Sequence, residues 1–233
     1  MIFVYKNQKY IKLILTFFAY FVVALYGSTL FSALGIQSEG LRLFLNDIVM
    51  LSFVLWMYYS NIKEDFREII KSYKIKKIIK NIILGVILVF LAKMFFGIIF
   101  DIAFNVDESA TDPNLTAIYD LAARFPLYIA FKTMIFTVIA EQLIFRESLR
   151  ECIDNKWLFV IISAFVITIV NYIFVDFTFG IPILYFAICG YFIPALAFSI
   201  VYVQNKSNIV MLMLTYFVYN LIPLISVFLI KEF

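Results

Sequence analysis

Long apolar stretches separated by short polar connections make up most of the chain. Each stretch approaches or exceeds the roughly 20 residues that an α-helix needs to cross the hydrocarbon core of a bilayer. Seven follow one another: Leu13–Leu34, Leu43–Ser60, Ile78–Phe104, Pro126–Leu149, Trp157–Val175, Ile181–Val203 and Ile209–Ile230. Lipid offers backbone groups no hydrogen-bond partner, so such segments form helices. The pattern predicts an all-α, polytopic membrane helix bundle of about seven transmembrane helices, with residues 1–233 as one membrane-embedded domain.

Composition supports this assignment to the lipid bilayer. Hydrophobic residues make up 64% of the chain and the mean hydropathy is +0.99, whereas soluble domains are about 45–50% apolar. A soluble globular domain is therefore excluded. The net charge of +3 is not a sign of nucleic-acid binding, because basic residues in membrane proteins report orientation.

Lysine and arginine are distributed unequally between the two sides of the predicted bundle. With a cytoplasmic N-terminus, the cytoplasmic side receives Lys6, Lys9, Lys12, Lys63, Arg67, Lys71, Lys74, Lys76, Lys77, Lys80, Arg146, Arg150, Lys156 and Lys206, and the other side only Arg42, Arg124 and Lys231. The excess of positive charge predicts that the N-terminus is cytoplasmic and the C-terminus outside.

The two longest connections have opposite character. Residues 61–80 are basic with an apolar rhythm, which fits either an amphipathic helix on the cytoplasmic leaflet or a charged linker that enforces topology. Residues 101–123 are acidic and are expected outside, as a solvated loop or as a docking surface for a partner.

The fourth apolar stretch contains a polar run, Glu141 to Arg146. An ionisable group at membrane depth costs on the order of 3 kcal/mol and usually marks a site, so Glu141 needs a counter-charge or a hydrogen-bond network. Lys93, in the middle of the third stretch, is the expected counter-charge. Lys132 lies nine residues from Glu141, on the opposite face of an α-helix, and is expected to reach Asp101 or to extend toward the outer surface. These intramembrane charges either fix helix packing or bind a ligand.

The chain contains no histidine. A glutamate–histidine centre that activates water, or a metal site with histidine ligands, therefore cannot be built. Neither a metal nor another cofactor is predicted.

Together, Glu141 and Arg146 resemble the EExxxR motif of the membrane-embedded proteases related to CAAX prenyl endopeptidases and to bacteriocin-processing, immunity and abortive-infection proteins. The resemblance extends over about residues 126–225. It places Gln142 at the second glutamate of the motif. The resemblance implies that such proteins activate a water molecule, or bind a metal that does so, for peptide hydrolysis within the bilayer.

Two further motifs of this family, FxxxH and HxxxN, are recognisable by their spacing. Ser163 matches the usual upstream serine and so places Asn171 at the first histidine. The Asn208-Ile209 pair resembles the start of the last motif, which places Tyr216 at its histidine and Asn220 at its asparagine.

The substitutions at these positions remove the chemistry that the family uses. Glutamine and asparagine do not act as bases at neutral pH, and tyrosine is a poor one. We therefore predict a catalytically degenerate member in a bacterial plasma membrane. The resemblance implies that such a member binds or regulates a protein partner such as a cell-wall hydrolase or a sensor kinase. The alternatives are an atypical peptidase that uses Glu141 on prenylated or leader peptides, and a bacteriocin self-immunity protein.

Overall fold

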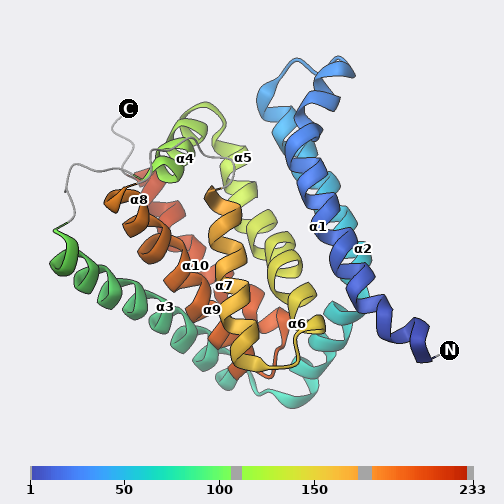
Figure 1. Cartoon of the computed structure of the whole chain (residues 1–233). Helices are drawn as coiled ribbons and strands as arrows, with labels where there is room; N and C mark the ends of the chain where they lie inside the picture. The colour runs from blue at the N-terminus through green and yellow to red at the C-terminus, as the bar shows by residue number, and fades with distance from the viewer. Residues whose placement is uncertain (1, 106–111, 173–179, 230–233) are drawn as a thin grey trace.

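The computed structural model describes residues 2–105, 112–172 and 180–229, and this part of the chain is helical without β-strands (Figure 1). Six helices or continuous helical rods are long and apolar enough to cross a membrane, namely Gln8–Ala33, Glu39–Ser72, Ile75–Phe104, Pro126–Cys152, Ile181–Gln204 and Ile209–Ser226. A seventh apolar helix, α7 (Lys156–Tyr172), is shorter. The chain is thus a multi-pass membrane protein, as the hydrophobic pattern predicted.

The helices follow in the order α1 (Ile2–Ala33), α2 (Glu39–Ser72), α3 (Ile75–Phe104), α4 (Pro113–Arg124), α5 (Pro126–Phe131), π-helices η1 (Lys132–Glu141) and η2 (Leu143–Glu147), α6 (Ser148–Cys152), α7, α8 (Ile181–Tyr185), π-helix η3 (Phe186–Phe192), α9 (Ile193–Gln204) and α10 (Ile209–Leu229). From α5 to α6 the chain is one rod, and from α8 to α9 it is another.

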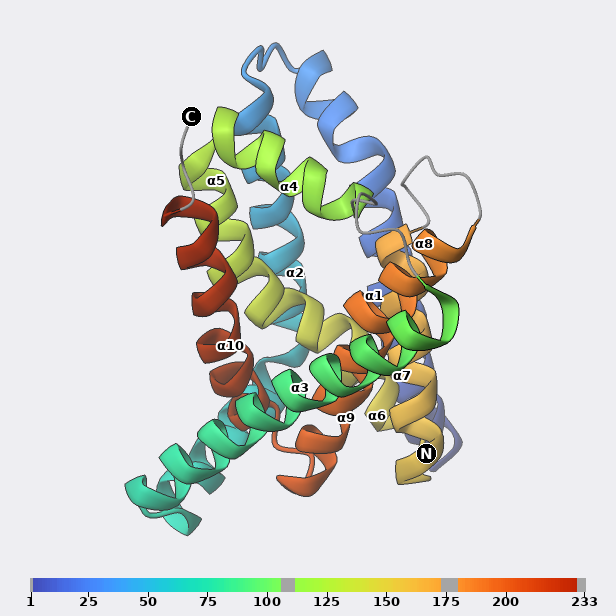
Figure 2. The ribbon, with the colours of Figure 1, turned by 90° about the vertical axis from the view of Figure 1, so that its left-hand side faces the viewer.

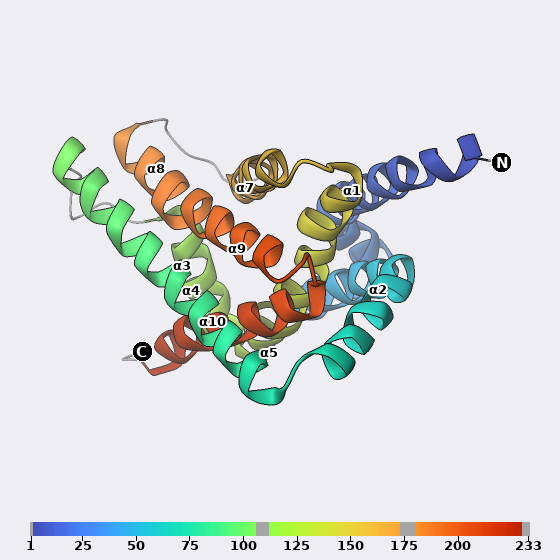
Figure 3. The same ribbon diagram turned by 90° about the horizontal axis from the view of Figure 1, so that it is seen from below.

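These two rods form the centre of the bundle. In the most apolar 18-residue window of each, 44% and 50% of the residues are buried, whereas in α1 only 6% are. Seen from below, α1 and α2 lie on one side of the central rods and α3 crosses the opposite side (Figure 3). The polar run of the fourth apolar stretch therefore lies in the best-packed part of the protein.

The basic segment 61–80 does not form a separate surface helix. α2 bends at Tyr58 (φ −111°, ψ 15°), continues through Ser72 and is followed almost at once by α3. Beyond the bend, Asp65 accepts a hydrogen bond from the Ile209 backbone N–H at 2.5 Å and so satisfies the start of α10. The hydrogen bond of Asp65 thus attaches this segment to the bundle. The basic composition of the segment did not predict this contact.

The predicted acidic loop 101–123 is largely helical where it is described. Asp101 belongs to the last turn of α3 and Asp120 to α4, which lies across one end of the bundle (Figure 2). Asp107 and Glu108 lie outside the described residues. The described part of this segment is thus made of the last turn of α3 and most of α4. Its predicted role in docking a partner stays a proposal.

Gly85 marks the closest approach of α3 to the central bundle. A Cβ atom there would lie 2.8 Å from Thr215 Cγ2 and 3.1 Å from Val201 Cγ1. Overpacking costs about 1–3 kcal/mol, and the better helix propensity of alanine recovers up to about 1 kcal/mol.

We therefore expect Gly85→Ala to lower the free energy of unfolding by about 1 kcal/mol, measured by SDS titration in detergent micelles. Gly97→Ala is the control, because its nearest atom would be Tyr185 Oη at 3.7 Å. Equal stability of the two variants would contradict this packing.

Candidate functional site

The π-helical geometry of η1 sets the direction of its two ionisable side chains. A helix closed by i→i+5 hydrogen bonds has about 4.4 residues per turn, so nine residues make about two full turns. Lys132 and Glu141 consequently point to the same side, and both line one cavity. The prediction that they lie on opposite faces was wrong because it assumed 3.6 residues per turn.

Arg146 is the most deeply embedded charge of this region, with a relative exposure of 2%. Its Nη1 donates a hydrogen bond to Gln142 Oε1, its Nε donates to Ser199 Oγ at 3.3 Å and its Nη2 to the Ala195 carbonyl at 3.3 Å. The guanidinium also faces the rings of Phe198 and Tyr216. Arg146 therefore joins the α5–α6 rod to α9 through its hydrogen bonds.

Gln142 uses both ends of its amide. Its Oε1 accepts from Arg146, while its Nε2 donates to the Thr137 carbonyl at 3.0 Å. A carboxylate could accept from the guanidinium but could not donate to a carbonyl oxygen. Gln142, at the position of the second glutamate of the motif, is thus fixed by hydrogen bonds at both ends of its amide.

Ser163 completes the interior network. Its hydroxyl lies 2.8 Å from Ser199 Oγ, and both serines are fully buried. The upstream serine of the second motif therefore connects α7 to the Arg146 group.

A cavity of about 190 Å³ lies at this network. Its lining residues come from α1, η1, η2, α7 and α10, with Gln142 between the two π-helices: Tyr20, Lys132, Glu141, Gln142, Phe145, Arg146, Ile167, Val170, Asn171 and Tyr216. Five of the six residues singled out at the family's motif positions thus meet around one space. Asn220 lies elsewhere, where its Nδ2 donates to the Thr133 carbonyl at 2.8 Å.

Lys93 does not neutralise Glu141. It is exposed on α3 and is not among the cavity residues, so the predicted pairing was wrong. Of the two lysines, Lys132 is the one that shares the cavity with Glu141. Nor does Lys132 reach Asp101; among the described residues, neither Lys132 nor Glu141 takes part in an ion pair within 4.0 Å.

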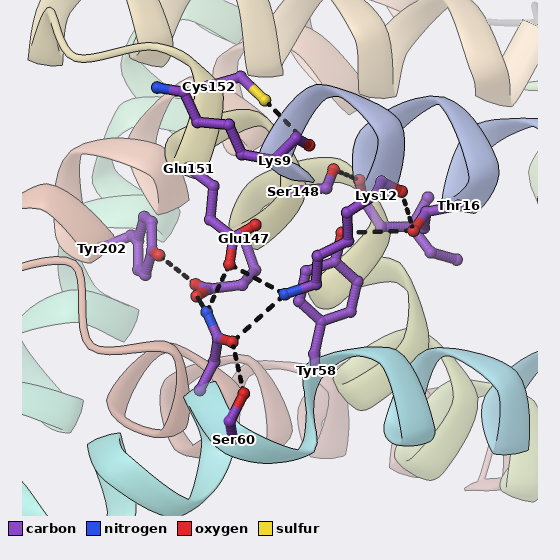
Figure 4. Close-up of polar contacts among 12 residues, drawn as sticks. Lys9, Lys12, Thr16, Tyr58, Ser60, Glu147, Ser148, Glu151, Cys152 and Tyr202 are labelled. Carbon is purple, nitrogen blue, oxygen red and sulfur yellow. Dashed lines mark hydrogen bonds and ion pairs between the residues drawn. The ribbon is translucent and has the colours of Figure 1, made fainter. Parts of the chain in front are cut away.

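A second polar network, which sequence reasoning missed, joins α1, α2, η2, α6 and α9 (Figure 4). Asn61 Nδ2 donates to Glu147 Oε1 at 2.6 Å and to Glu151 Oε1 at 2.7 Å. Tyr202 Oη donates to the other oxygen of Glu147 at 2.5 Å, and Lys12 forms an ion pair of 3.0 Å with Glu151. Two carboxylates are thus held by one amide, one phenol and one cation.

The sequence does contain a signal for this network. Glu147 and Glu151 are four residues apart, which places them on one face of a helix. They lie just beyond the polar run, at the end of the predicted span, where charged residues are ordinary. Glu147 and Glu151 form a network only because Lys12 of α1 and Asn61 of α2 approach them in the fold.

Residues 123–222 match the model of a family described as type II CAAX prenyl endopeptidase Rce1-like. This part of the chain is Rce1-like. The match confirms the resemblance that the polar run indicated and covers nearly the predicted range. No curated protein and no solved structure matches the chain.

The Rce1-like segment contains the α5–α6 rod, α7, α9 and most of α10, and thereby all but one of the cavity residues. The exception is Tyr20 of α1. The described residues include no group of three or more histidine, cysteine, aspartate or glutamate side chains placed to hold a metal ion. The Rce1-like cavity of this chain therefore offers one carboxylate, two cations and several neutral polar groups.

Proposed function

We propose that this chain is a non-catalytic relative of the CAAX prenyl endopeptidases that binds and regulates another protein of the bacterial membrane or cell envelope. A cell-wall hydrolase or a sensor kinase is the kind of partner we expect. The observation that carries the proposal is the hydrogen bonding of Gln142, whose amide is engaged at both ends. At the position of the second glutamate, Gln142 thus stabilises the structure through hydrogen bonds.

The other substituted positions support the same view. Asn171 Nδ2 donates to the Ile167 carbonyl of its own helix at 2.8 Å. Tyr216 packs against the ring of Phe198, with ring centroids 4.3 Å apart. Neither residue supplies a base at neutral pH, and the chain has no histidine to replace them.

An atypical peptidase is the second candidate, because Glu141 lines the cavity and is not occupied by an ion pair. In that mechanism Glu141 would take a proton from water, and Asn171 would donate a hydrogen bond to the developing oxyanion. One N–H of the Asn171 amide donates to the Ile167 carbonyl, so the second N–H would have to make this bond.

Affinity purification of the tagged full chain from its native membrane, followed by quantitative mass spectrometry, tests the proposal. We expect one membrane or envelope protein at near-stoichiometric amounts with the unmodified chain and with Glu141→Ala. Regulation by binding needs no catalytic group. Removal of the Glu141 carboxylate should therefore not abolish capture of the partner.

A peptidase assay in liposomes tests the competing function on the same two proteins. Prenylated peptides and leader peptides should remain intact with both. Reproducible cleavage that disappears in Glu141→Ala would contradict the non-catalytic proposal, and Lys93→Met serves as the matched control outside the cavity.

A further inference from the structure

The cavity is lined by one lysine and one glutamate side chain that do not contact each other. Lys132 and Glu141 both line it, yet no ion pair within 4.0 Å joins them to each other or to any other described residue. Charges removed from water are normally paired. The space between these two charges is therefore suited to a polar molecule that contacts both.

The two most deeply buried polar side chains around the cavity are already engaged. Arg146 donates to Gln142, Ser199 and Ala195, and Gln142 donates to Thr137. Outside the cavity lining, Asp47 also acts on the charge of Lys132, and its Oδ2 accepts a hydrogen bond from Tyr128 at 3.0 Å. The amine and carboxyl groups left for a ligand are thus those of Lys132 and Glu141, beside the neutral polar side chains of Tyr20, Asn171 and Tyr216.

The cavity volume limits the size of that ligand. About 190 Å³ corresponds to about six water molecules at roughly 30 Å³ each and is below the roughly 300–1,000 Å³ of sites for drug-sized molecules. This size favours a small molecule over a prenyl chain or an extended peptide.

We propose that this cavity binds a small zwitterion, namely a free amino acid with a short side chain. Its carboxylate would contact Lys132 and its ammonium group would contact Glu141. The proposal rests on the proposed function, because a site used for peptide hydrolysis would need the same carboxylate to activate water. It adds a ligand to the regulatory role: the chain would report the presence of that amino acid to its partner.

Binding to the purified full chain in detergent, measured by the rise of the melting temperature and by equilibrium binding of radiolabelled ligand, tests the proposal. Glycine, L-alanine and L-serine are the probes, and acetate and methylammonium chloride each carry only one of the two charges. Acetate and methylammonium each lack one of the charge-assisted hydrogen bonds that an amino acid would form. Each should therefore bind about tenfold or more weakly than the best amino acid. L-Leucine should bind more weakly than L-alanine because of its size.

The variants Lys132→Met and Glu141→Gln should each reduce the affinity for the best amino acid by about tenfold or more, whereas Lys93→Met should not change it. Absence of saturable binding by all three amino acids, or equal affinity for acetate, would overturn the proposal. The ligand series uses the unmodified protein, so the result does not depend on the folding of a variant. Partner capture is measured independently, so failure of amino-acid binding leaves the proposed function testable on its own.

Discussion

Replacement of Arg146 by methionine should lower the free energy of unfolding by about 3 kcal/mol, because it removes one partner from a buried hydrogen-bonded group. Gln142 Oε1 would lose its donor, and the contacts to the rings of Phe198 and Tyr216 would be lost as well. Removal of the buried charge itself returns part of this cost. SDS titration in mixed micelles measures the difference.

Arg124→Met is the matched control for this experiment. Arg124 forms an ion pair with Glu39 at 2.8 Å, but both side chains are about half exposed, at 53% and 46%. Exposed ion pairs contribute about 0–1 kcal/mol. Equal destabilisation by the two substitutions would show that Arg146 does not stabilise the interior network.

Replacement of Lys12 by methionine should lower the free energy of unfolding by about 2 kcal/mol, less than for a fully buried pair because the Lys12 and Glu151 side chains keep 19% and 23% of their exposure. Without the ammonium group, two carboxylates would share the single amide of Asn61. We also expect α1 to separate more readily from α6, which can be measured as the distance between spin labels on the two helices.

A double-mutant cycle isolates this interaction. Lys12→Met combined with Glu151→Gln should cost less than the sum of the two single substitutions, because the second change removes the carboxylate that lost its partner. Lys9→Met is the control, since in the described part of the chain the Lys9 ammonium group forms no ion pair and lies only over the ring of the adjacent Tyr10. Strict additivity would contradict a direct interaction between Lys12 and Glu151.

The fold could be predicted from the sequence because the physical signal is strong. Apolar stretches of spanning length have almost no alternative to helices in lipid, and six of the helical segments found are long enough to span. Charge counting also indicated the orientation of the chain, which stays a prediction. The bend at Tyr58 was not predicted, because no proline or glycine marks it in the sequence.

The candidate site was predicted only in part. The motif spacing identified Glu141, Gln142, Arg146, Asn171 and Tyr216, which line one cavity within the segment that matches the Rce1-like family model. The predicted pairing of Glu141 with Lys93 was wrong. Lys132 lies on the same side as Glu141 instead, because the direction of its side chain depends on the helix type and not on the amino acids alone. The network of Glu147 and Glu151 was missed because its cation, Lys12, lies more than 130 residues away along the chain.

The wide turns of η1 have a consequence for the comparison of this chain with its relatives. In an α-helix, removal of one residue rotates everything beyond it by about 100°, and a π-helical turn holds about one residue more than an α-helical turn. A relative with an ordinary helix here will therefore place the same side chains around the cavity only if its sequence is shorter between Lys132 and Glu141. An insertion or deletion in this interval would indicate a change of helix geometry and not a loss of the site.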